Sequence, residues 1–268
     1  MPTDIPWTDV TDWYVRQYRW SGMADAPVEC LAIHGAGSDH TVWNLLVACT
    51  RTVSAAVPIA WFAVDLPGHG RSPRPAADTI VAYAEALTAW PRTGRRQVLV
   101  GHSMGGAIAL ESAIRFPRRW DGLILVATGA RLRVHPDLRT RLDTGDKRGA
   151  IEWLLRWLFG PRATPEVRKR TRQKLERTLL ATLRADFSAC HHFDRMGDLD
   201  RVRIPTLVLV GTADRMTPVT YGEYLAHHIT HAQLRQIPDA GHMIMLETPE
   251  SLARGILAFL QERVLAGP

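Results

Sequence analysis

The sequence predicts an α/β fold in which a mostly parallel sheet is covered by helices on both faces. The first observation is a set of short runs rich in Val, Ile and Leu without polar alternation, which is typical of strands buried on both faces. The second is that helical patterns separate these runs, so right-handed crossovers are expected. The strand-like runs are residues 28–33, 59–64, 97–100, 122–127, 206–210 and 233–237.

The remaining elements complete this alternation. Helical patterns cover residues 78–90, 104–116, 221–229 and 249–264. Residues 12–20 alternate aromatic and polar side chains, which predicts an antiparallel strand at the edge of the sheet. The chain has 268 residues, of which 46% are hydrophobic and 22% charged, so it can bury a large core and is not mainly disordered.

The alternation stops between residues 127 and 206, where no strand-like run occurs. Two helical segments lie there, at residues 150–159 and 165–184, and Thr164 before Pro165 is a helix-start signal. A helical block between two core strands indicates a cap over the carboxyl edge of the sheet. We therefore predict a core of residues 1–128 and 201–268, and a helical cap of residues 129–200.

The formal net charge of +6 raises the question of a nucleic-acid partner. Of the 33 basic residues 30 are arginine, but they are spread along the chain, and the dense stretch at 168–174 is typical of a solvated helix face. We expect no nucleic-acid partner. We also expect no stable membrane insertion, because no run of 18 apolar residues occurs.

The cysteines and the first residues of the chain indicate the cellular compartment in which we expect the protein. The three cysteines are odd in number and widely spaced, which favours a reducing environment over a disulfide scaffold: Cys30, Cys49 and Cys190. Residues 1–10 include Asp4 and Asp9 and no apolar block, unlike a secretory signal. We expect a cytoplasmic protein; the sequence leaves its oligomeric state open.

A Gly-x-Ser-x-Gly motif follows the run at 97–100 and precedes a helical pattern, in the sequence Gly101-His102-Ser103-Met104-Gly105-Gly106. This strand–turn–helix context predicts a nucleophilic serine on a tight turn, with its hydroxyl clear of the sheet. Glycines on both sides keep side chains from clashing across the turn. The amide of Met104, at the start of the helix, is predicted to donate to an oxyanion.

A serine needs a base beside it, and the base needs an orienting carboxylate. We predict His242 as the base, because it follows the run at 233–237, and Asp214 as the acid, because it follows the run at 206–210. All three side chains then lie at the carboxyl edge of the sheet, in the order Ser, Asp, His. The structural alternatives are a solvated loop histidine and an aspartate that caps the helix after Pro218. His102 adjoins Ser103 but is expected to point away from it.

The second oxyanion donor is expected from the turn Gly35-Ala36-Gly37, which follows the run at 28–33. We predict that the Ala36 amide donates, with Gly37 as the second choice. His34 is interpreted as a hydrogen-bonding scaffold residue. Gly35, Gly37, Trp153, Phe187 and Met243 are candidates to contact the substrate, and the Met104 side chain is a further candidate for the pocket.

Five motifs in order resemble the α/β-hydrolase superfamily, and specifically its capped esterase- and lactonase-like members. They are His34-Gly35-Ala36-Gly37, the segment 65–72 (Asp-Leu-Pro-Gly-His-Gly-Arg-Ser), the motif around Ser103, Gly211-x-x-Asp214 with Pro218, and Gly241-His242 with Glu247-Thr248-Pro249. The resemblance implies an eight-stranded, mostly parallel sheet, a cap after the sixth strand, and hydrolysis without a cofactor or metal. The segment 65–72 is interpreted as architectural.

Departures from relatives narrow this interpretation. Haloalkane- and epoxide-hydrolysing relatives place Asp where this chain has Ser103. Iminopeptidase-like members have His-Gly-Gly-Pro-Gly at the oxyanion turn, which is absent here. Members that cleave C–C bonds of ring-fission products usually carry Trp after the base, where this chain has Met243. Perhydrolase-like members share most of these motifs and are not separated from esterases by sequence.

We therefore predict a serine hydrolase that cleaves an ester or lactone of a small, largely apolar substrate through an acyl-enzyme. The alternatives are a C–C bond hydrolase of a diketone-like compound and a weakly hydrolytic ligand receptor of the same fold. The group Cys190-His191-His192 with Asp186 and Asp194 could suggest a metal, but adjacent helical histidines point about 100° apart and favour cap packing.

Overall fold

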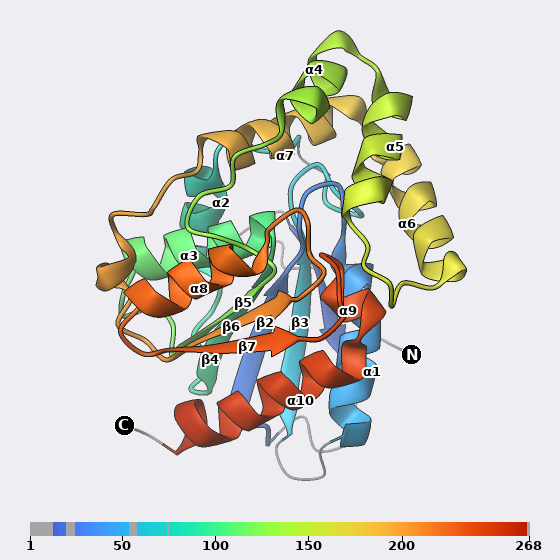
Figure 1. The fold of residues 1–268 in the computed structure, drawn as a ribbon. Helices are drawn as coiled ribbons and strands as arrows, with labels where there is room; N and C mark the ends of the chain where they lie inside the picture. The colour runs from blue at the N-terminus through green and yellow to red at the C-terminus, as the bar shows by residue number, and fades with distance from the viewer. Residues whose placement is uncertain (1–12, 20–24, 54–57, 74, 267–268) are drawn as a thin grey trace.

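The computed structural model describes residues 13–19, 25–53, 58–73 and 75–266, which form a twisted sheet with helices on both faces and above one edge (Figure 1). The expectation for residues 1–10 lies outside the described residues. The strand order is β1-β3-β2-β4-β5-β6-β7; β1 runs antiparallel to β3, and the other neighbours are parallel. The strands are β1 Tyr14–Tyr18, β2 Val28–Ile33, β3 Ile59–Asp65, β4 Arg96–His102, β5 Gly122–Val126, β6 Thr206–Gly211 and β7 Ala232–Ile237.

The strand number differs from the expectation. The described residues form seven strands rather than eight, and the helical insert follows β5, the fifth strand in chain order, rather than a sixth. At this edge of the sheet β1 pairs antiparallel with β3, and among the described residues no further strand pairs with β1. The seven apolar or alternating runs of the sequence correspond to these seven strands; the number eight came from the family resemblance.

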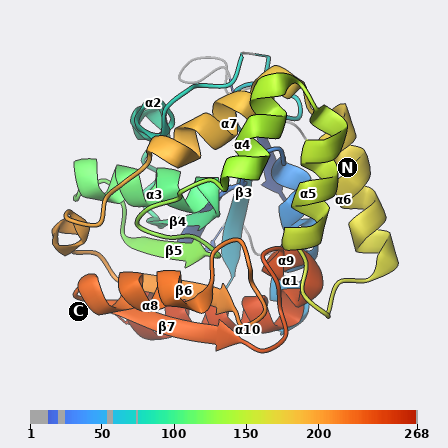
Figure 2. The same ribbon diagram turned by 45° about the horizontal axis from the view of Figure 1, so that its top comes forward.

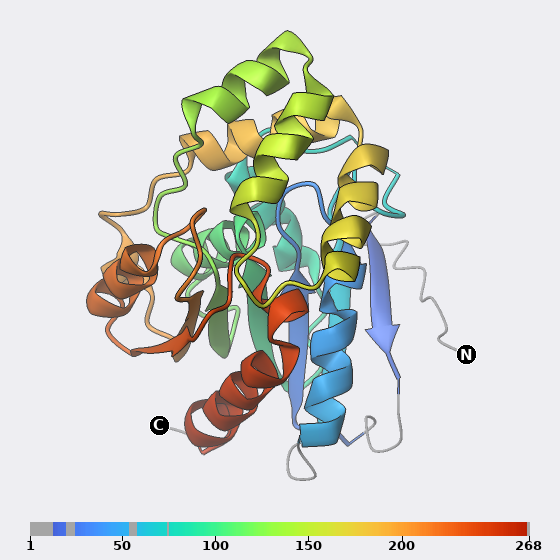
Figure 3. The ribbon, with the colours of Figure 1, turned by 45° about the vertical axis from the view of Figure 1, so that its right-hand side comes forward.

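Successive residues of each central strand face opposite sides, which explains the continuous apolar runs. Val98 and Val100 face the side covered by α1 (Asn44–Val53) and α10 (Pro249–Phe259), whereas Leu99 faces α2 (Ile80–Ala86), α3 (Met104–Arg115) and α8 (Val219–His228). Figure 3 shows α1 and α10 side by side along one face. The shorter elements are η1 His40–Trp43, η2 Leu87–Ala89, η3 Leu199–Arg201, α9 Ile244–Glu247 and the π-helical turn η4 Leu260–Leu265.

Four helices lie between β5 and β6 and sit above the carboxyl ends of the strands (Figure 2). They are α4 Pro136–Thr144, α5 Lys147–Trp157, α6 Pro165–Arg177 and α7 Leu180–His192. Thr164 caps α6 through the Val167 amide, as its sequence signal predicts. The helix α4 was not predicted, although Pro136 at its first turn is a start signal.

The segment 165–184 was predicted as one helix, and the structure divides it. Thr178 and Leu179 have extended backbones, with ψ values of 134° and 144°, between α6 and α7. At the break the Thr178 hydroxyl lies 3.1 Å from Lys174 O of α6 and 3.3 Å from Gly37 O. Helical periodicity alone does not show this boundary, which lies beside a tertiary contact. In the part of the chain described, no helix is both long and apolar enough to span a membrane.

Candidate active site

Ser103 lies on a tight turn between β4 and α3. Its backbone has φ 53° and ψ −116°, a conformation that costs a non-glycine residue of order 1–3 kcal/mol and persists only where the surroundings impose it. Here the Ser103 amide donates to Val126 O at 3.0 Å and its carbonyl accepts from the Thr128 hydroxyl at 2.8 Å. A Cβ on Gly101 would lie 2.2 Å from Gly105 O, so this close approach requires glycine.

His242 is oriented by Asp214. Its Nδ1 lies 2.9 Å from Asp214 Oδ2, and both side chains are buried. Since a carboxylate only accepts, Nδ1 carries the proton of the neutral ring and Nε2 is left as an acceptor. This is the tautomer that a general base needs.

Asp214 also holds the turn on which it sits. Its Oδ1 accepts from the amides of Met216 at 2.8 Å and Thr217 at 3.0 Å, and its Oδ2 accepts from the Thr217 hydroxyl at 2.8 Å. Burial alone would raise the pKa of Asp214, but the charge of His242 and the hydrogen bonds from His242 and Thr217 outweigh it and lower the pKa. The capping role and the orienting role are therefore compatible in one side chain.

Ser103 and His242 line the same cavity, which has a volume of about 400 Å³. Within the described residues, the Ser103 hydroxyl makes no hydrogen bond to the His242 ring. In unliganded enzymes, catalytic hydrogen bonds of this kind often tighten only when the substrate is bound. The structure thus brings the two predicted side chains to one cavity without closing the bond between them.

The two predicted oxyanion amides differ in origin. Met104 is the first residue of α3, so its amide has no partner in the ladder of that helix. Ala36 lines the large cavity, as do Gly35 and Gly37. The second choice, the Gly37 amide, is not available, because it donates to Asp186 Oδ2 at 2.8 Å.

A second cavity of about 180 Å³ also reaches Ser103 and His242. Trp153 lies in this smaller cavity beside Trp157, and the two rings stack with centroids 5.0 Å apart. Phe187 lines both cavities, whereas Met243 lines only the larger one. The Met104 side chain is buried in the core beneath the turn and contacts neither cavity.

The insert contacts the His242 loop directly. The amides of His242 and Met243 both point to Leu158 O, at 2.9 and 3.3 Å. Glu247 Oε2 accepts from the amides of Gly160 and Gly241, at 2.9 and 3.1 Å. Sequence reasoning placed Glu247 in a motif without giving it this role, and nothing in the sequence pointed to Leu158.

His34 holds the oxyanion turn from below. Its Nδ1 donates to Gly35 O at 2.8 Å, and its Nε2 accepts from the Leu66 amide at 3.0 Å, so the ring is neutral. Burial, with the neighbouring His69, lowers the pKa of His34 to about 4. This is a scaffold geometry and not that of a general base.

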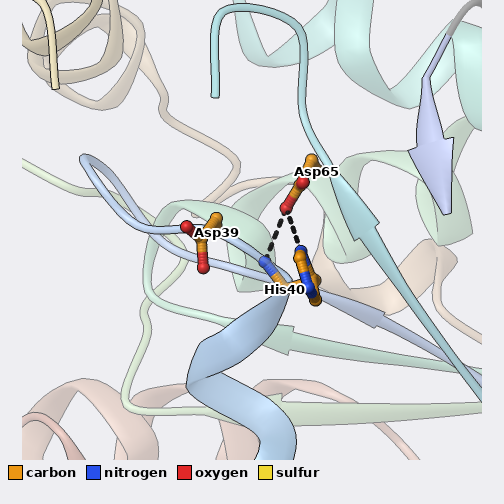
Figure 4. Close-up of side chains that lie close together, drawn as sticks. All are labelled: Asp39, His40 and Asp65. Carbon is orange, nitrogen blue, oxygen red and sulfur yellow. Dashed lines mark hydrogen bonds and ion pairs between the residues drawn. The ribbon is translucent and has the colours of Figure 1, made fainter. Parts of the chain in front are cut away.

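One acidic cluster could suggest a metal, and Figure 4 shows it: Asp39, His40 and Asp65. Asp65 Oδ1 accepts from the amide and Nδ1 of His40, at 2.7 and 2.8 Å, and its Oδ2 accepts from the Arg71 amide at 2.9 Å. Asp39 is paired with Lys174; burial alone would raise its pKa, but Lys174 and Thr41 lower it to about 2. These oxygens already serve protein donors, and the Lys174 ammonium opposes a cation.

The group around Cys190 does not converge either. His191 contacts the Val134 amide and Arg139, whereas His192 faces Ser188 O of its own helix. Asp186 is directed to the core instead, where it contacts Gly37 and His69. Sequence reasoning missed that contact. The available signal was that Asp186 lies on the same face of α7 as the buried Leu183 and Cys190.

A strained serine turn, an oriented histidine and a cavity at the carboxyl edge of a parallel sheet define a hydrolase of the α/β class. The model of the alpha/beta hydrolase family matches residues 30–254, and the chain belongs to that family.

Comparisons with individual proteins agree with this family assignment. A pimeloyl-[acyl-carrier protein] methyl ester esterase of Neisseria meningitidis serogroup C is 31% identical over 89% of this chain and 95% of its own length. The solved structure of a thermophilic esterase has 30% identity and a TM-score of 0.80, covering 98% of both chains. The enol-lactonase of Burkholderia xenovorans LB400, at 22% identity and a TM-score of 0.81 over 94% of this chain and 98% of its own, shows the shared fold.

The chain also matches part of a much longer protein. It is 34% identical to polyketide synthase ThaQ of Burkholderia thailandensis over 87% of this chain, but spans only 12% of that synthase. Together these matches support ester hydrolysis as the general chemistry of this α/β hydrolase.

Proposed function

We propose that this chain hydrolyses carboxylic esters or lactones of a small, largely apolar substrate through an acyl-enzyme on Ser103. His242 Nε2 takes the Ser103 proton as the hydroxyl attacks the carbonyl carbon, and Asp214 stabilises the resulting imidazolium. The amides of Ala36 and Met104 bind the tetrahedral oxyanion. His242 returns the proton to the leaving alcohol, and water activated by His242 then releases the acid.

The observation that carries this proposal is the 2.9 Å bond between His242 Nδ1 and Asp214 Oδ2 beside the Ser103 cavity. It leaves His242 Nε2 as the acceptor on the side of the ring away from Asp214. No cofactor or metal is part of this chemistry, because the two amides supply the positive potential that the oxyanion requires.

The test is the Ser103→Ala variant, assayed with a short nitrophenyl ester and with a fluorophosphonate label. We expect loss of labelling and a fall in kcat of about 10⁴-fold or more. Retained turnover in this variant would remove Ser103 from its role. The wild-type protein also separates the alternatives: labelling without turnover favours a ligand receptor, and faster cleavage of a vinylogous diketone than of esters favours a C–C hydrolase.

A second candidate function is hydrolysis of an ester whose acyl chain is attached to an acidic carrier protein. The segment 129–200 holds 16 of the 33 basic and 10 of the 27 acidic residues, so it carries the whole net charge of +6 and the remainder is neutral. One wall of the large cavity is α6, where Arg170 pairs with Glu166 and Lys174 with Asp39. The net positive charge of the segment would attract an acidic partner. The relative from Neisseria meningitidis is named for a carrier-bound ester.

Charge reversal on α6 tests this candidate. Within the described residues, Lys169 and Arg177 form no ion pair, so Lys169→Glu and Arg177→Glu change the surface charge without breaking an ion pair. We expect a several-fold rise in KM for a methyl ester of a carrier-bound acyl chain, weakened further by salt, and no change for a nitrophenyl ester. Arg203→Glu, at an exposed residue outside the segment 129–200 that has no ion pair among the described residues, is the control. Equal effects on both substrates would contradict a carrier partner.

A further inference from the structure

Gly37 of the oxyanion turn is held on three sides by the insert. Its amide donates to Asp186 Oδ2 at 2.8 Å, and its carbonyl accepts from the Thr178 hydroxyl at 3.3 Å. With φ at +65°, a Cβ here would lie 2.7 Å from Leu183 and 2.9 Å from Leu175, so the helices pack directly on the Gly37 backbone. A side chain at this position would adopt a strained φ and would push the ends of Leu175 and Leu183 aside.

Asp186 holds this amide as a charged acceptor. It is fully buried on α7, and the same Oδ2 lies 2.8 Å from His69 Nε2. The other ring nitrogen of His69, Nδ1, lies 3.0 Å from Pro67 O, a group that only accepts. Both nitrogens therefore donate, and His69 is an imidazolium paired with the Asp186 carboxylate. Burial alone would lower the pKa of His69, but the Asp186 charge and hydrogen bond raise it.

The preceding peptide group is held from the core. Gly35 O accepts from His34 Nδ1 at 2.8 Å and from the Ser38 amide at 3.2 Å. Because a trans peptide is planar, the Ala36 N–H of that peptide points opposite to Gly35 O, away from His34. The core thus fixes one peptide of the turn, and Asp186 fixes the next.

We infer that Asp186 is a positioning residue for the oxyanion turn: this side chain of the insert fixes the Ala36–Gly37 peptide, so that Ala36 is held from both sides and its amide, in the peptide that His34 holds, keeps its direction toward the reacting carbonyl. The inference rests on the proposed function, since it requires that the Ala36 amide stabilise an oxyanion. It makes the placement of α7 a condition for chemistry and not only for enclosing the substrate.

Three variants separate this role from simple stabilisation. Asp186→Ala removes the acceptor, and Asp186→Asn keeps a carbonyl oxygen for the Gly37 amide but removes the charge. Thr178→Val removes the hydroxyl on the other side of Gly37 at nearly constant size. Asp194→Ala is the control, because it removes a partly exposed acid of the same insert that pairs with Arg131 and Arg133.

The readouts are kcat and KM per labelled active site, and the affinity for a boronic acid, which forms a tetrahedral adduct with a catalytic serine. For Asp186→Ala we expect kcat and boronate affinity to fall together, by about tenfold to a hundredfold, at nearly constant KM. Asp186→Asn is expected to stay within about threefold of wild type, and Thr178→Val to lie between them. Hydrogen exchange of the Gly37 amide should be fast only in Asp186→Ala.

The outcomes distinguish the two proposals. If the wild type hydrolyses esters but Asp186→Ala keeps its kcat and boronate affinity, the positioning role is wrong and the proposed function stands. If Asp186→Asn loses as much as Asp186→Ala, the ion pair with His69 matters and the Gly37 contact does not, which also overturns the inference. If Asp186→Ala does not fold, an unchanged boronate affinity in an Asp186→Asn protein whose Gly37 amide exchanges fast overturns it. Wild-type protein without turnover or boronate binding removes both proposals.

Discussion

The ring of His102 donates from Nε2 to the main-chain carbonyl of His242 at 3.0 Å, and the two rings lie 4.8 Å apart. His102 is therefore turned away from the serine that follows it and toward the loop of the proposed base. Its Nδ1 is buried without a partner, so the ring is neutral. Burial, together with the neighbouring His242, lowers the pKa of His102 to about 3.

Buried neutral histidines make this protein sensitive to acid. His102 and His34 titrate at about 3 and 4 in the folded state, against 6.5 for an ordinary histidine. Between these values the unfolded chain binds protons that the folded chain does not, so the free energy of unfolding falls as the pH drops below about 6.5. Each histidine contributes a slope of about 1.4 kcal/mol per pH unit there.

Urea unfolding at pH 7, 6 and 5 measures this slope. His102→Gln should reduce it by about half. A free energy of unfolding that does not change between pH 6.5 and 5 would contradict the assignment.

His69 acts in the opposite direction: its raised pKa stabilises the fold below about pH 6.5, and this contribution is lost as the pH rises through the folded value.

Asp214→Asn tests the orientation of the base. An asparagine amide at the Oδ2 position would donate toward His242 and favour the tautomer with the proton on Nε2, which cannot accept from Ser103. We expect kcat to fall by about 10³- to 10⁴-fold with little loss of folding. Thr217→Val is the control, because it removes a donor to the same oxygen but keeps the carboxylate. A kcat within tenfold of wild type would show that Asp214 only caps its turn.

Gly105→Ala tests the packing of the serine turn. The added Cβ would lie 2.2 Å from Ile33 O, a backbone atom that cannot move alone. We expect a loss of about 3 kcal/mol or more in the free energy of unfolding, or no folded protein. Gly197→Ala, where a Cβ meets nothing within 4 Å, should change stability by less than about 1 kcal/mol. Equal stabilities of the two variants, measured by urea unfolding, would refute this close approach.

Phe187→Ala tests the division of the substrate site. Phe187 lines both cavities, so its removal should join them beside Ser103. We expect the preference within a nitrophenyl ester series to shift toward longer or bulkier acyl groups, by about tenfold in relative kcat/KM. Leu246→Ala is the matched control, because Leu246 lines the large cavity and not the small one. An unchanged preference would mean that only one cavity receives the substrate.

Much of the fold follows from the sequence because the responsible interactions are local or periodic. The run 28–33 has the bounds of β2, and the other runs differ from their strands by at most two residues at either end. The glycines around Ser103 permit one tight turn and few alternatives, so the motif predicted both the position and the strain of that residue. Asp214 and His242 follow their strands, which predicted that they would meet at one edge.

The remaining features depend on contacts between distant residues. Asp186 and Gly37 lie 149 positions apart, and no periodicity shows that a carboxylate on α7 will accept from the oxyanion turn. The break at Thr178 lies where its hydroxyl is within reach of both Gly37 O and Lys174 O, although the helical pattern continues through it. The seven-stranded sheet likewise depends on which segment pairs with β3. The sequence by itself determined the strands, the serine turn and the identity of the candidate triad, because backbone preference and burial act locally. The tertiary structure decided how the insert holds the oxyanion turn and divides the cavity, because those contacts exist only once the helices have docked.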